Sequence, residues 1–69
     1  MQMIVNVLRI ETILAEQNMT KVEFARKCGV SRQTISTILR SGSCEPRTAG
    51  KLALGLGVSV SDILEGNRC

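Results

Sequence analysis

The segment from Thr20 to Arg40 carries the start and stop signals of two short helices joined by a tight turn. Thr20 can cap the first helix, and Glu23 stands three residues later, which is the spacing of a reciprocal capping box. Gly29 follows where that helix should stop, because a residue without Cβ adopts a left-handed conformation at little cost. Ser31 can cap a second helix. The segment therefore predicts two short helices that pack across a turn.

Apolar residues at helical spacing predict which faces of these helices are buried. The inward residues are Val22, Phe24, Ala25 and Cys28 in the first helix, and Ile35, Ile38 and Leu39 in the second. The outward residues of the second helix are Arg32, Gln33, Thr34, Ser36, Thr37 and Arg40, with no acidic residue among them. These side chains match base edges and phosphates in a major groove. The alternative is a solvated face that lacks acids by chance.

The two caps, the Gly-Val-Ser turn and the polar second helix match the helix-turn-helix layout, in which the second helix enters the major groove. The pattern Thr20-x-x-Glu-Phe-Ala-x-x-x-Gly-Val-Ser-x-x-Thr-Ile-Ser36 resembles the helix-turn-helix of the phage-repressor and Cro family of transcription regulators. The similarity continues through Pro46 to Leu64. It implies an all-α, compact five-helix domain like that of lambda repressor, with residues 1–69 as one domain and the helix-turn-helix at about 20–40.

The resemblance implies sequence-specific binding of double-stranded DNA by a transcription regulator, with repression the expected mode. Gln33 is the first expected base reader, because its amide can bond N6 and N7 of adenine together. The expected base-reading set is Arg32, Gln33, Thr34 and Thr37. The expected phosphate contacts are Lys21, Ser31, Arg40, Ser41, Ser43 and Arg47. Ser41 and Ser43 belong to a link that lies along the phosphate backbone in the family and is one residue longer here.

One departure from the family has a physical consequence. Many relatives carry Arg at the position of Leu14 and Glu at the position of Leu39, where the two form a largely buried ion pair. Both positions are leucine here. Desolvation offsets most of the Coulombic gain of such a pair, so an apolar pair of similar volume replaces it at little net cost. We therefore expect Leu14 and Leu39 to touch.

The N-terminal residues allow two interpretations. Asn6 can cap a helix from about Val7 to Gln17, whose inward residues would be Val7, Ile10, Ile13 and Leu14. Alternatively, residues 1–6 form a short strand, which would be an exposed edge able to pair with a symmetry mate. Asn18 can end the helix in a left-handed conformation, with Met19 entering the core.

Two further helices are expected after the helix-turn-helix. Pro46 suits the first turn of a fourth helix, whose inward residues would be Ala49, Leu52, Ala53 and Leu56. Gly50 and Gly55 each lower its intrinsic stability by roughly 1 kcal/mol, so tertiary packing must hold it. Gly57 ends it, Val58 enters the core, and Ser59 with Asp62 can form a capping box for a last helix to about Glu65. Val60 and Leu64 are either core residues or part of the dimer contact that the resemblance implies.

Charge and composition narrow the partners. Between residues 20 and 51 there are seven Lys and Arg against two Glu, whereas the remainder of the chain has two against four. The basic charge thus gathers where a phosphate-binding surface is expected. The single aromatic residue, Phe24, argues against single-stranded nucleic acid or RNA, whose binding relies on stacking. No apolar run could span a bilayer and no basic signal peptide is evident, so we expect a cytoplasmic protein.

The three cysteines do not predict a metal site or a disulfide framework. Cys28, Cys44 and Cys69 lack CxxC spacing, and the chain has no histidine. Cys28 is expected in the core. Cys44 would lie in a loop near the DNA surface, where a redox role is conceivable, and terminal Cys69 could cross-link molecules on oxidation. We expect no enzymatic activity, cofactor or small-molecule ligand, because no catalytic constellation is evident.

The expected partner is a palindromic operator bound by a homodimer, with two recognition helices about 34 Å apart. A protein-binding module, such as the antitoxin of a toxin–antitoxin pair, is the alternative because it can share this fold. Only residues 1–6 and 66–69 would then be available as an extra segment for binding the partner.

Overall fold

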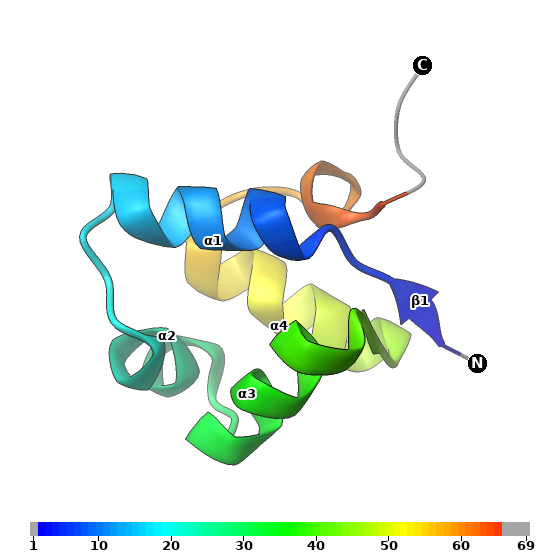
Figure 1. Ribbon diagram of the computed structural model, residues 1–69, viewed down its shortest axis with the longest axis horizontal. Helices are drawn as coiled ribbons and strands as arrows, with labels where there is room; N and C mark the ends of the chain where they lie inside the picture. The colour runs from blue at the N-terminus through cyan, green and yellow to red at the C-terminus, as the bar shows by residue number, and fades with distance from the viewer. Residues whose placement is uncertain (1, 66–69) are drawn as a thin grey trace.

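The computed structural model describes residues 2–65, which form a mostly helical fold with a small two-stranded sheet. The elements are β1 (Met3–Ile4), α1 (Val7–Glu16), α2 (Lys21–Cys28), α3 (Arg32–Ser41), β2 (Ser43–Cys44), α4 (Pro46–Leu56) and the 3-10 turn η1 (Val60–Ile63). Helices α2 and α3 lie on one side of α1 (Figure 1). The expected all-α class is confirmed.

The expected fifth helix is wrong. Its residues form only the short turn η1, which begins at the Ser59 backbone N–H donating to the Asp62 carboxylate at 3.2 Å. Leu64 is already extended, with φ −90° and ψ 138°, and forms an antiparallel bridge with Val5. The backbone after Ile63 therefore pairs with the N-terminal segment instead of continuing a helix.

The helix signals between residues 20 and 31 are confirmed. Glu23 donates its backbone N–H to the Thr20 hydroxyl at 3.1 Å, and its carboxylate accepts the Thr20 N–H at 2.8 Å. Gly29 has φ 76°, in the left-handed region, and ends α2. The Ser31 hydroxyl accepts the Thr34 N–H at 3.1 Å at the start of α3. These bonds satisfy backbone donors that a helix start otherwise leaves open.

One hydrophobic core joins all the helices. Its largest fully buried side chains are Phe24, Ile10, Ile35, Leu52 and Ile63. The four inward residues expected in α4 are all buried, and so are Ile13, Leu14 and Ile38. The half-buried residues packed against this core include Val7, Met19, Val30, Leu39 and Val58. Leu14 and Leu39 thus belong to the same apolar cluster, and direct contact between them stays a prediction.

Val22 was expected to face inward, and this is wrong because its side chain is 43% exposed. Helix α2 turns Phe24, Ala25 and Cys28 toward the core. Val22 lies on a different face of this short helix, because a step of two residues turns by about 200°. Asn18, which directly follows the C-cap residue of α1, has φ 53°, as expected for a left-handed stop.

Helices α2 and α4 lie close together at Gly55. A Cβ added there would lie 2.5 Å from the Cys28 Sγ and 3.3 Å from the Cys28 backbone nitrogen. Cys28 is buried as expected, and burial raises the pKa of its thiol to about 11. Gly55 therefore trades helix propensity for close packing between two helices.

Both interpretations of the N-terminal residues hold in part. Asn6 caps α1, because its side-chain oxygen accepts the Arg9 N–H at 3.0 Å. The residues before it form β1, which pairs with β2 in the register Met3 with Cys44 and Ile4 with Ser43. The expected exposed edge is wrong, because β1 meets β2 on one side and the segment after η1 on the other.

Cys44 does not lie in a loop as expected. It is 5% exposed within β2, and burial raises the pKa of its thiol. A raised pKa disfavours the reactive thiolate, so the structure gives no support to a redox role. Cys69 and the possible partner segment 66–69 lie outside the described residues.

Replacing Gly55 by Ala should destabilise the protein by about 1–3 kcal/mol, because the new methyl group overpacks the contact with Cys28. Gly50→Ala is the matched control: it lies in the same helix with no atom within 4 Å of the added Cβ, and should stabilise by about 0.5–1 kcal/mol. Urea unfolding measures both, and Cys28→Ala should relieve part of the Gly55→Ala defect. Equal stabilisation by the two alanines would contradict the close approach.

Glu23→Gln should make stability less sensitive to acid. The pKa of Glu23 lies below its ordinary value of 4.5, because the backbone N–H and then the hydroxyl of Thr20 hydrogen-bond its carboxylate. A carboxylate with a lowered folded-state pKa adds stability above its unfolded pKa and loses it as the pH falls through the folded value. Urea unfolding from neutral pH to about pH 3 should show the wild-type advantage over Glu23→Gln shrinking. A constant difference would contradict this assignment.

Candidate nucleic-acid interface

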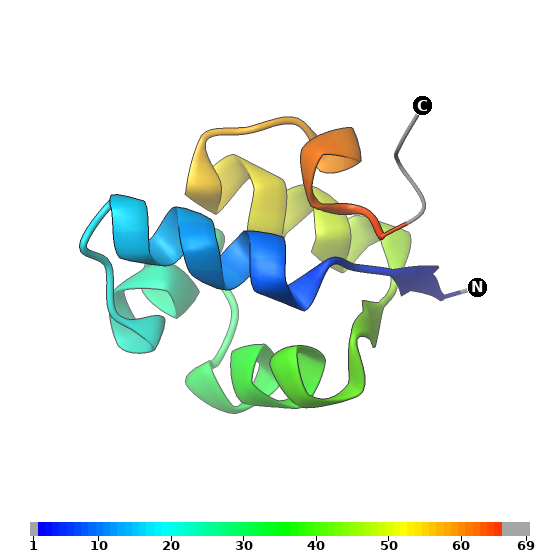
Figure 2. The ribbon, with the colours of Figure 1, turned by 45° about the horizontal axis from the view of Figure 1, so that its top comes forward.

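The outward face of α3 is open to solvent and free of acidic residues. Figure 2 shows α3 along one side of the molecule, with no other helix beyond it. Arg32, Gln33, Thr37 and Arg40 are exposed, whereas Thr34 and Ser36 are half-buried. The opposite face carries Ile35, which is buried in the core. The core thus determines which side chains of α3 can meet a partner.

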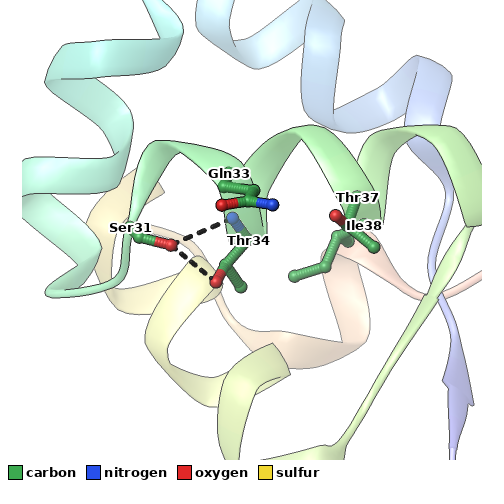
Figure 3. Close-up of a pocket in the computed structure, with 5 residues that line it drawn as sticks. All are labelled: Ser31, Gln33, Thr34, Thr37 and Ile38. Atoms are coloured by element: carbon green, nitrogen blue, oxygen red, sulfur yellow. Dashed lines mark hydrogen bonds between the residues drawn. The ribbon is translucent and has the colours of Figure 1, made fainter.

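Part of this face forms a hollow of about 290 Å³. Its lining residues are Ser31, Gln33, Thr34, Thr37 and Ile38, all on α3 or its cap, and Figure 3 shows them along the first turns of the helix. Three of the four expected base readers therefore lie together. Arg32 is exposed nearby and does not line the hollow.

Ile38 is a lining residue that the sequence reasoning assigned only to the core. It is buried, yet it follows Thr34 by four residues and so lies one turn further along the same helix face. That spacing could have indicated its place. The hollow consequently has an apolar portion as well as polar walls.

Hydrogen bonds within the hollow separate its polar groups into two kinds. The hydroxyls of Ser31 and Thr34 lie 2.8 Å apart and bond each other, and Ser31 also accepts the Thr34 N–H (Figure 3). The amide of Gln33 and the hydroxyl of Thr37 make no side-chain hydrogen bond to any other residue from 2 to 65. Gln33 and Thr37 are therefore available to a ligand, whereas the Ser31 and Thr34 hydroxyls already have partners.

The three cations among the expected phosphate contacts lie in the first or last turn of a helix. Lys21 is the exposed first residue of α2, and Arg47 is the exposed second residue of α4. The positive end of a helix dipole favours anions at both places, although Glu23 already brings a carboxylate to the start of α2. Helix α4 has no side-chain cap at Glu45, which leaves its first backbone amides to other acceptors. Arg40 is exposed in the last turn of α3.

The segment after α3 carries two neutral donors. Ser41 is exposed and its hydroxyl donates to the Ser43 carbonyl oxygen at 3.3 Å. The Ser43 backbone N–H in turn reaches the Ser41 hydroxyl at 3.4 Å, a long bond. Both groups are thus held close together at the C-terminal end of α3.

Two other kinds of site were sought in the described part of the chain. Among residues 2–65 no group of three or more Cys, Asp or Glu side chains is arranged to hold a metal ion. Within the same range, no helix has both the length and the apolar character needed to cross a membrane.

Comparison with known protein families gives a match over most of the chain. The model of a family described as "Helix-turn-helix" matches residues 10–63, which run from α1 to η1 and include every residue of the candidate interface. No curated protein and no solved structure matches the chain. The matched range covers most of the 69 residues and contains the capped α2–turn–α3 unit described above. The chain belongs to the Cro/C1-type helix-turn-helix family of DNA-binding transcription regulators.

Proposed function

We propose that this protein is a sequence-specific repressor that acts by occupying an operator, with residues 1–69 as a single DNA-binding domain and no catalytic activity of its own. The observation that carries the proposal is the acid-free outward face of α3, whose hollow brings Gln33, Thr34 and Thr37 together. A helix of this kind fits the major groove, which is wide enough to admit it. A cytoplasmic location is part of the same proposal.

The hollow supports distinct roles for its residues. The Gln33 amide, without a partner among the described residues, reads adenine through N6 and N7. The Thr34 hydroxyl is held by Ser31, so Thr34 offers chiefly its methyl group. Together with Ile38 and Thr37 it forms an apolar surface suited to the 5-methyl group of thymine. Arg32, outside the hollow, reads guanine or binds a phosphate at the helix start.

Phosphate binding is assigned to residues around α3. The proposed contacts are Lys21, Ser31, Arg40, Ser41, Ser43 and Arg47. The three cations supply charge, and the serines supply neutral donors that fix register. Because cation–phosphate contacts release counterions, affinity should fall steeply as salt rises.

A homodimer on a palindromic operator is the proposed assembly, because two recognition helices about 34 Å apart would enter successive major grooves. Val60 and Leu64 are half-buried and pack against their own core, so only part of each side chain is open to a second subunit. The antitoxin alternative has less support, because residues 3–5 pair within their own chain.

Selection of bound sequences from random duplex DNA tests this function, with a palindromic consensus expected. On the selected site Gln33→Ala should cost roughly 1–3 kcal/mol and relax the preference at one base position per half-site. Lys21→Gln should weaken all sequences alike, because a phosphate contact carries no direct sequence information.

Lys51→Gln is the matched control for Lys21→Gln, since it removes the same charge from an exposed position within α4. It should change affinity much less. Unchanged binding by both Gln33→Ala and Lys21→Gln would refute the docking arrangement. Absence of any enriched sequence would refute sequence-specific binding itself.

A further inference from the structure

Strand β1 lies between two segments that are far apart in the sequence. On one side it pairs with β2, and the Val5 backbone N–H donates to the Gly42 carbonyl oxygen at 2.9 Å. On the other side the Glu65 N–H donates to the Ile4 carbonyl at 2.9 Å, and the Asn6 N–H donates to the Ile63 carbonyl at 2.7 Å. Figures 1 and 2 both show β1 beside the last described residues. The N-terminal segment is thus hydrogen-bonded both to the segment that follows α3 and to the residues at the end of η1.

The hydrogen bond between Val5 and Gly42 is made at the C-terminal end of α3. Gly42 is the residue that ends this helix, with φ 78° and its N–H donating to the Ile38 carbonyl at 2.7 Å. Its carbonyl is the acceptor of the Val5 N–H. Val5 itself is 3% exposed, so the donor is anchored in the core. The end of α3 is therefore tied to a buried residue from outside the helix-turn-helix.

The ladder also determines which edge of β2 remains open. In an antiparallel pair, hydrogen-bonded and non-hydrogen-bonded residue pairs alternate. The Val5–Gly42 pair is bonded, so in the neighbouring Ile4–Ser43 pair the Ser43 N–H points away from β1. On that free edge it meets the Ser41 hydroxyl at 3.4 Å. Strand β1 thus holds one edge of this segment, while the Ser43 N–H and the Ser41 hydroxyl lie on the opposite edge, joined by a long hydrogen bond.

We propose that β1 and the Val5 N–H position residues 41–43 for a phosphate of bound DNA, making Val5 a positioning residue that does not touch the DNA. This inference rests on the proposed function and adds to it a segment that positions the phosphate-binding residues. That segment, residues 3–5, lies outside the range 10–63 that the family model matches. A strand of two residues has little stability of its own and depends on its neighbours.

The test replaces single phosphates of the selected operator by uncharged methylphosphonates and measures the affinity of each variant. In wild type, replacement of the phosphate facing residues 41–43 should lower affinity roughly tenfold, as loss of a charge-assisted hydrogen bond would. Ser41→Ala identifies that phosphate, because the penalty there should shrink. Val5→Pro lacks the N–H that is donated to Gly42, so replacing this phosphate should no longer lower its affinity. Its affinity losses at the other phosphates and its base preference should be unchanged.

Val5→Ala is the matched control, because it loses buried methyl groups but keeps the N–H, and it should retain the penalty. All variants are compared where circular dichroism shows them folded. Deletion of residues 2–5, which removes both β1 and the Val5 N–H, serves as a second variant if Val5→Pro does not fold. Wild-type penalties in the folded Val5→Pro or deletion variant would overturn the proposal. Loss of the affinity penalty in Val5→Ala would also overturn it. If neither Val5→Pro nor the deletion variant folds, β1 serves stability alone and the proposal is likewise overturned. Absence of duplex binding by wild type would instead refute the proposed function.

Discussion

The direction in which α3 presents its side chains depends on the tight turn that joins it to α2. Gly29 takes a left-handed conformation, Val30 packs against the core, and the Ser31 hydroxyl caps α3 at the Thr34 N–H. Each of these three groups restricts the rotation or sliding of α3 relative to α2. With Ile35 then buried, the polar face of α3 has only solvent or a partner to meet.

The remaining elements of the fold hold α2 and α3 in place. Gly55 lets α4 approach α2 at Cys28, which closes the core with few large side chains. The N-terminal segment, which is itself hydrogen-bonded to Ile63 of η1, reaches the other end of α3 through the Val5 N–H and the Gly42 carbonyl. Both ends of α3 are therefore fixed by contacts from outside it. A base-reading helix needs this, because small changes in its angle move amide and hydroxyl groups out of hydrogen-bond range.

Local signals predicted most of the helical structure. The Thr20–Glu23 box, the stops at Gly29 and Gly57, and the buried face of α4 each depend on residues within a few positions of one another. Apart from Val22, whose face on α2 was misjudged, the misses involve pairing between distant segments. Strand β1 has two residues whose partner lies forty positions away, and this pairing also buries Cys44 and diverts Leu64 from a last helix. The expected readers Gln33, Thr34 and Thr37 do meet in one hollow, but the engagement of the Thr34 hydroxyl by Ser31 required the side-chain geometry.

The most direct measurement of the central claim is a residue-resolved map of backbone amide chemical shifts during titration with the selected duplex. The largest changes should fall on residues 31–37, with further changes at residues 21, 41–43 and 47. The exposed side of α1 around Leu8 should change little, because no residue of α1 belongs to the proposed interface. Changes concentrated on α1 or around Leu54, with α3 unaffected, would contradict the account.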